Sequence, residues 1–115
     1  MTNLIENTVL ARDERAILLR CRDAIKGLDS KADLILYGSR ARGNAEHDSD
    51  YDLLVVTDGP ASLEQEDLLR RQLYAIELET SAVLTVILLN REDWNSALYD
   101  AMPFYRNIKR EGVVV

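Results

Sequence analysis

Two short stretches of the sequence combine residue types suited to binding phosphate and a metal ion. The first is Gly38-Ser39-Arg40-Ala41-Arg42-Gly43, which follows the apolar run Leu34-Ile35-Leu36-Tyr37. Such a run is typical of a buried strand, and a glycine directly after it permits a tight turn. Backbone N–H groups exposed in a turn bind phosphate oxygens, and a serine hydroxyl and two arginines add donors and positive charge. This stretch therefore predicts a phosphate-binding turn.

The second stretch supplies two carboxylates. Asp50 and Asp52 stand at the start of the apolar run Leu53-Leu54-Val55-Val56. Because side chains alternate along a strand, both aspartates are expected on one face of the sheet, where they repel each other unless a cation lies between them. Two carboxylates together with substrate phosphates are typical Mg²⁺ ligands. A phosphate-binding turn beside such a pair indicates phosphoryl or nucleotidyl transfer, with Asp50 and Asp52 as catalytic and metal-binding residues.

The combined pattern, Gly-Ser-x-Ala-x-Gly followed by Ser-Asp-x-Asp-Leu, resembles the minimal nucleotidyltransferases of the DNA polymerase beta superfamily. The resemblance covers essentially all of residues 1–115 and implies a single domain. It implies an α+β fold, with a small mixed β-sheet and helices packed on one face. It also implies ATP as substrate, two Mg²⁺ ions at Asp50 and Asp52, and transfer of AMP to a hydroxyl acceptor. The expected nucleotide-binding residues are Gly38, Ser39, Arg40 and Arg42.

The resemblance also bears on the acceptor and the partner. At this length we expect no second domain to bind an acceptor. Family members of this size commonly act with a partner, often a small helical protein of the HEPN type, and some are antitoxins that transfer AMP to a tyrosine of a HEPN ribonuclease toxin. The resemblance implies such a partner here, with a homo-oligomer as the other possibility. The expected contact points are the apolar tail and three residues before it: Val113–Val115, Phe104, Tyr105 and Ile108.

The position of a third carboxylate separates two hypotheses. Enzymes that resemble this chain carry a third acid on the strand after the long helix, and here Thr85 stands at that position. A threonine cannot act as a carboxylate base, and the nearest acids, Glu77 and Glu79, reach the site only if the strand register is shifted. The first hypothesis is a Mg²⁺-dependent nucleotidyltransferase. The second is a catalytically impaired nucleotide- or partner-binding subunit that neutralises or scaffolds a HEPN-type protein without transfer.

Hydrophobic periodicity predicts the elements that position these residues. The helices are expected over residues 13–28, 63–78, 91–101 and 104–110, and the strands over 32–37, 50–57 and 81–89. The last strand is apolar enough for a central or well-covered position. Trp94 and Leu98, four residues apart, are expected on the inner face of one helix. Cys21 is expected to be a buried thiol.

Composition excludes several classes of protein. The chain has 115 residues, 47% of them hydrophobic, a formal net charge of −6 and one cysteine. A single cysteine excludes an internal disulfide and a cysteine-based zinc site. The negative charge argues against non-specific binding to nucleic acid. The sequence shows neither a signal peptide nor an apolar run long enough for a membrane span, so we expect a cytoplasmic protein without membrane contacts.

Overall fold

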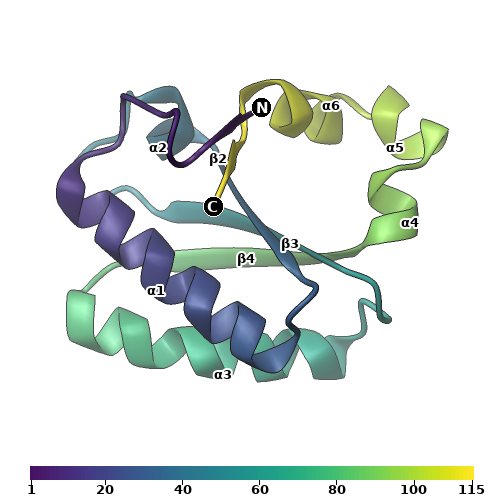
Figure 1. Cartoon of the computed structure of the whole chain (residues 1–115), viewed down its shortest axis with the longest axis horizontal. Coiled ribbons are helices and arrows are strands. Elements are labelled where there is room, and N and C mark those ends of the chain that lie inside the picture. The colour runs from purple at the N-terminus through teal and green to yellow at the C-terminus, as the bar shows by residue number, and fades with distance from the viewer.

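The computed structural model describes residues 1–115, which form a five-stranded mixed sheet with helices against both faces (Figure 1). The elements in chain order are β1 (Thr2–Asn3), α1 (Arg12–Leu28), β2 (Asp33–Tyr37), α2 (Ser39–Arg42), β3 (Tyr51–Thr57), α3 (Leu63–Thr80), β4 (Leu84–Asn90), α4 (Arg91–Trp94), α5 (Ala97–Ala101), α6 (Pro103–Glu111) and β5 (Val113–Val114). None of the helices combines the length and apolarity needed to cross a membrane.

The sheet has the strand order β1-β5-β2-β3-β4. Strand β2 is antiparallel to β3 and β5, whereas β3 is parallel to β4 and β1 is parallel to β5. The predicted mixed sheet in an α+β fold is therefore confirmed. The two ends of the chain meet in this sheet, as Figure 1 shows, because β1 and β5 are neighbours.

The tail Val113–Val115 was expected among the contact points for a partner, and for Val113 this expectation is wrong, because the residue is buried in the sheet. Val113 and Val114 pair with β2 on one side and with β1 on the other, and Val113 is only 1% exposed. Ile108 is also buried, so it too is unavailable to a partner. Backbone pairing explains the tail, because an apolar strand gains both hydrogen bonds and burial inside a sheet.

The two long helices, α1 and α3, lie side by side on one face of the sheet (Figure 1). Their buried residues recur at helical spacing and join the larger core: Leu18, Cys21 and Ile25 from α1, and Leu69, Leu73 and Ile76 from α3. Both predicted helices are confirmed. Burial raises the pKa of the Cys21 thiol to about 12, which keeps it protonated and agrees with the expected structural role.

The opposite face of the sheet is covered only in part. Trp94 of α4 and Ile108 of α6 pack there against the outward-facing residues of three strands: Ile35, Leu54, Val56 and Leu89. The single helix predicted over 91–101 is broken, because the Ser96 side chain accepts a hydrogen bond from the Tyr99 N–H and starts a new helix. The break rotates Leu98 outward, to 70% exposure, so its predicted inward position is wrong.

Strand β4 lies at the edge of the sheet. Its apolar character comes from cover on both faces, since Leu84 and Val86 pack in the core beneath α1 and α3, and Leu89 packs against Trp94. The predicted strand also begins three residues too early. Ser81 has a left-handed backbone with φ of 63° and ends α3, so β4 starts only at Leu84.

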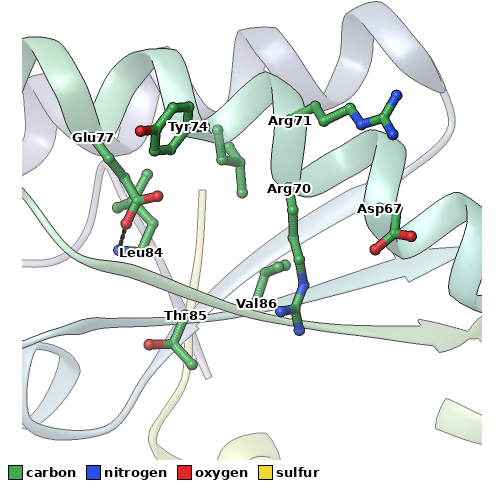
Figure 2. Close-up of a pocket in the computed structure, with 9 residues that line it drawn as sticks. Asp67, Arg70, Arg71, Tyr74, Glu77, Leu84, Thr85 and Val86 are labelled. Carbon is green, nitrogen blue, oxygen red and sulfur yellow. Dashed lines mark hydrogen bonds between the residues drawn. The ribbon is translucent and has the colours of Figure 1, made fainter.

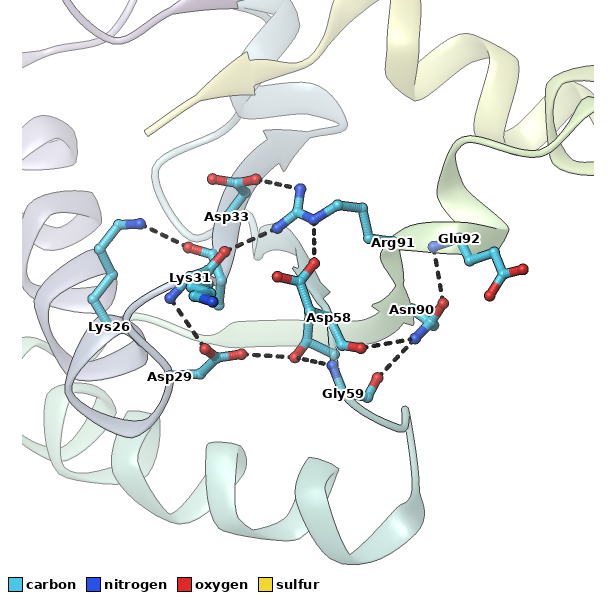
Figure 3. Close-up of polar contacts among 11 residues, drawn as sticks. Lys26, Asp29, Lys31, Asp33, Asp58, Gly59, Asn90, Arg91 and Glu92 are labelled. Carbon is cyan, nitrogen blue, oxygen red and sulfur yellow. Dashed lines mark hydrogen bonds and ion pairs between the residues drawn. The ribbon is translucent and has the colours of Figure 1, made fainter.

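Polar contacts connect three strands where β2 begins and where β3 and β4 end, far from Asp52 (Figure 3). The Arg91 guanidinium contacts Asp33 at 2.6 Å and Asp58 at 2.5 Å. The Thr57 hydroxyl donates to Asp29 at 2.7 Å. These contacts join the start of β2 to the ends of β3 and β4. They hold the strands in register and leave the other end of the sheet free to carry a site.

Candidate active site

The turn between β2 and α2 is shaped around Gly38. Its φ is +79° and its ψ is −156°, a conformation that side-chain-bearing residues rarely adopt. A Cβ at this position would lie 2.2 Å from Oδ2 of Asp52. The Asp52 carboxylate therefore lies directly over the glycine backbone. Only glycine satisfies both requirements, which explains the residue type on which the sequence prediction rested.

Ser39 follows at the first position of α2 and is half-buried. Its hydroxyl lies at the start of α2, where it can donate to a ligand. The first-turn N–H groups of a helix have no intrahelical acceptors. Gly38 and Ser39 are therefore placed as predicted, with donors beside the Asp52 carboxylate.

Asp50, Asp52 and Thr85 meet on the sheet face opposite α1 and α3. In the parallel pairing of β3 with β4, Asp52 stands opposite Thr85. The Thr85 hydroxyl donates a hydrogen bond to Oδ2 of Asp50 at 3.2 Å. Tyr51, between the two aspartates, is buried in the core on the other face, as strand alternation requires. Thr85 therefore lies at the position of the third carboxylate, as expected from the sequence.

The two carboxylates interact electrostatically. The pKa of Asp52 is raised above its usual value, first by desolvation and then by the negative charge of Asp50, while the Arg42 guanidinium lowers it. A cation shared by the two groups would relieve this repulsion. Two carboxylate oxygens beside a phosphate-binding turn are also the donors that Mg²⁺ takes in phosphoryl-transfer sites, so the residues present fit such an ion.

A third acid is absent from the site. The Glu77 carboxylate accepts a hydrogen bond from the Leu84 N–H at 2.9 Å and so holds the start of β4. Glu79 pairs with Arg20 of α1. Nowhere in the chain do three or more His, Cys, Asp or Glu side chains converge to hold a metal ion. The site therefore offers two carboxylates and a hydroxyl.

Arg40 does not face this site, and its expected contact with a nucleotide is not supported. The residue is 8% exposed, and its guanidinium forms an ion pair with Glu14 at 2.9 Å. It also donates to the carbonyl oxygen of Ser49 at 2.7 Å and lies 4.1 Å from the centre of the Tyr51 ring. All of these groups belong to the loop and the helical face of the sheet. Arg40 is an anchor for the segment that carries Asp50.

Arg42 lies near the aspartates. It is exposed, and its positive charge lowers the pKa of the Asp52 carboxyl. It forms an ion pair with Glu111, at 3.1 Å near the surface. An exposed ion pair of this kind contributes little to the free energy of unfolding, so Arg42 can leave it readily for another partner. Arg42 is therefore the arginine of the motif that can turn to a phosphate.

Tyr37 is a residue of this face that the motif analysis did not single out. It is paired with Asp52 across β2 and β3. Strand alternation was the signal that could have found it, since Tyr37 directly precedes Gly38 and shares a face with Ile35. Burial, followed by the negative charge of Asp52, raises the pKa of Tyr37 to about 12. Its phenol is therefore neutral at physiological pH.

A separate open pocket of about 810 Å³ lies between α3 and the edge strand β4. Figure 2 shows Glu77 and Arg70 reaching from α3 toward β4, whereas the Thr85 side chain points away from α3. Thr85 lines the pocket and also contacts Asp50. The pocket therefore adjoins the candidate site across the free edge of the sheet.

Comparison with known proteins agrees with this arrangement. Residues 18–114 match the family described as the nucleotidyltransferase domain, and the chain belongs to this family. The structure is similar to that of Cid1, an RNA terminal uridylyl transferase, with a TM-score of 0.50 and 22% identity. The similarity covers 87% of this chain but only 37% of Cid1, and at this identity it shows a shared fold alone. None of the curated proteins is a significant match.

Proposed function

We propose that this chain is a Mg²⁺-dependent nucleotidyltransferase that moves AMP from ATP to a hydroxyl on a protein partner of the HEPN type, as an antitoxin does. The observation that carries the proposal is the contact of the Asp52 carboxylate with Gly38. It brings one carboxylate of the aspartate pair against the turn that we propose binds phosphate. A structural role alone would not require two like charges on one exposed face.

Each residue of the site has a part in the proposed reaction. The turn at Gly38 and Ser39 would bind the triphosphate, and Arg42 would neutralise charge on its β- and γ-phosphates. Asp50 and Asp52 would hold Mg²⁺, which supplies charge neutralisation at the phosphates. The acceptor oxygen would attack the α-phosphorus, the bond to the bridging oxygen would break, and pyrophosphate would leave. The acceptor proton would pass to solvent, because the site has no third carboxylate to take it.

The acceptor is the least constrained part of the proposal. Cid1 acts on RNA, but the net charge of −6 on the present chain disfavours a polyanionic acceptor. The chain also spans only 37% of the length of Cid1, so the larger protein's substrates do not transfer to it. A protein hydroxyl needs no extended basic surface. A protein acceptor is therefore favoured over a nucleic acid.

One observation favours the second hypothesis, a subunit that binds nucleotide or a HEPN-type partner without transfer. Thr85 lies at the position of the third carboxylate, and its hydroxyl donates a hydrogen bond to Asp50. The loss of a general base typically reduces a rate about 10²–10⁴-fold. A site with two carboxylates can still bind a nucleotide with its metal. Binding without turnover would then be the function.

The test is a transfer assay with each of the four nucleoside triphosphates labelled on the α-phosphate. The protein is incubated with Mg²⁺ and a lysate that contains the product of its neighbouring gene. The control is the Asp50→Asn/Asp52→Asn variant, which removes both charges without a large change of volume. The proposal predicts label on one protein band with ATP, only with the unaltered chain and only with Mg²⁺.

The Thr85→Asp variant separates the two hypotheses. If the unaltered chain transfers label, Thr85 does not prevent catalysis and the first hypothesis stands. If the unaltered chain binds ATP but transfers label only after Thr85→Asp, the second hypothesis is correct. Absence of both nucleotide binding and transfer would refute both hypotheses about this site.

A further inference from the structure

A cluster of aromatic rings lies on the sheet face that carries the aspartates. The Phe104 ring meets the Tyr37 ring edge-on, with centroids 5.6 Å apart, and meets the Tyr105 ring edge-on at 5.0 Å. Tyr105 in turn contacts Tyr99 at 4.8 Å. Tyr37 comes from β2 and the other rings come from α5 and α6. Edge-to-face contacts of this kind fix the orientation of a ring.

The cluster begins beside the phosphate-binding turn. Tyr37 directly precedes Gly38 and stands opposite Asp52 in the antiparallel pairing of β2 with β3. Opposite residues in such a pair have Cβ atoms about 4.5–5.5 Å apart. The negative charge of Asp52 is among the causes that raise the pKa of Tyr37 to about 12. The aromatic surface is therefore continuous with the candidate active site.

Phe104 is the exposed member of the cluster. It is 47% exposed, although large apolar side chains are usually buried and this ring is held by two neighbours. Val113 and Ile108, which were grouped with it as contact points for a partner, are buried in the core. Phe104 is thus a rigid aromatic surface next to the turn. Stacking on such a ring suits any nucleobase, since every base has a π-face.

We propose that Phe104, held by Tyr37 and Tyr105, is the surface on which the base of the nucleotide stacks while its phosphates bind at Gly38 and Asp52. This inference rests on the proposed nucleotide site and adds the part that recognises the base. Because larger rings overlap more, purine triphosphates bind more tightly than pyrimidine triphosphates. The preference between adenine and guanine is weak, because stacking does not read hydrogen-bonding groups.

The test compares two ligands that differ only in the nucleoside, Mg²⁺–ATP and Mg²⁺–tripolyphosphate. Their affinities are measured by isothermal titration calorimetry on the whole chain. Phe104→Ala is expected to weaken ATP binding about tenfold or more and to leave tripolyphosphate binding unchanged. Phe104→Trp retains the stacking surface and is expected to retain ATP affinity. Leu98→Ala, which removes another exposed apolar side chain, is expected to change neither affinity.

The outcomes separate this inference from the proposed function. If the unaltered chain binds both ligands and Phe104→Ala binds ATP equally well, the stacking surface is refuted and the phosphate site stands. An equal loss of both ligands in Phe104→Ala and Phe104→Trp would show a general disturbance and would also refute it. If neither ligand binds the unaltered chain, the proposed function fails and the inference with it.

Discussion

Gly38 joins backbone conformation to the chemistry of the site. Its φ of +79° is available to glycine at little cost, and the carboxylate of Asp52 fills the space where a side chain would begin. An alanine here would be strained and would also push Asp52 away from the turn. The geometry of the carboxylate pair therefore depends on a residue that carries no functional group.

Gly38→Ala is predicted to reduce the affinity for Mg²⁺–ATP about tenfold or more and to lower the free energy of unfolding by about 1 kcal/mol or more. Calorimetry and chemical denaturation measure the two effects. Gly27→Ala is the matched control, because a Cβ at Gly27 in α1 would meet no atom within 4 Å. That control should be stabilised by about 1 kcal/mol. Unchanged nucleotide affinity in Gly38→Ala would contradict the close packing of Asp52.

The raised pKa of Asp52 makes a prediction about pH. In the metal-free protein the folded state binds a proton at this carboxyl more tightly than the unfolded state. The contribution of Asp52 to stability therefore falls as pH rises from the ordinary carboxyl pKa through the raised value. Asp52→Asn removes this penalty, so at pH 7 without metal it is predicted to have a higher Tm than the unaltered chain.

Thermal denaturation at several pH values measures this effect. The difference in Tm between Asp52→Asn and the unaltered chain should shrink as pH falls toward 4, because the Asp52 carboxyl becomes increasingly protonated in the folded state. Added Mg²⁺ should raise the Tm of the unaltered chain and leave the variant unchanged. A variant less stable than the unaltered chain at pH 7 would show that Asp52 is held by favourable contacts instead of being repelled by Asp50.

At the scale of elements, Arg40 fastens α2 and the loop after it to α1. The guanidinium pairs with Glu14, and both side chains are largely buried. It also donates to the carbonyl oxygens of His47 and Ser49, in the loop that leads to Asp50. Removal of one member of a buried pair leaves the other charge uncompensated. The position of Asp50 thus depends on a contact made on the opposite face of the sheet.

Arg40→Met is predicted to lower the free energy of unfolding by about 3 kcal/mol, as measured by urea denaturation. Arg42→Met breaks the exposed pair with Glu111 and should cost about 1 kcal/mol or less. The effect on nucleotide affinity should have the reverse order. Arg42→Met is expected to remove a phosphate contact and Arg40→Met is not, since only Arg42 can reach the nucleotide. A larger stability loss in Arg42→Met than in Arg40→Met would reverse the roles given to the two arginines.

Local patterns predicted the elements but not their neighbours. Strand alternation correctly put Asp50 and Asp52 on one face, because that relation is fixed within a few residues. The direction of Arg40 depends on Glu14, 26 residues away, and no local pattern contains this contact. The edge position of β4 likewise depends on strand order. Serine is a favoured N-cap residue, so Ser96 was the local signal for the break inside an otherwise helical run.

At the scale of the molecule, different parts of the sheet provide stability and carry the candidate site. Helices α1 and α3 cover one face, and the contacts around Arg91 and Thr57 secure the far end of the strands. The near end of the other face carries Gly38, both aspartates and Thr85. Each functional side chain is thus attached to a strand or turn that the opposite face holds in place. Such support is what a site needs to keep two repelling carboxylates together.

We propose above all that Asp50 and Asp52 form a site for a metal-bound nucleotide. The most direct measurement is calorimetric titration of ATP into the unaltered chain with Mg²⁺ and with EDTA, repeated for Asp50→Asn/Asp52→Asn. We expect binding that needs both Mg²⁺ and the two carboxylates. ATP binding that is as strong in EDTA, or as strong in the double variant, would show that the aspartate pair is not the nucleotide site.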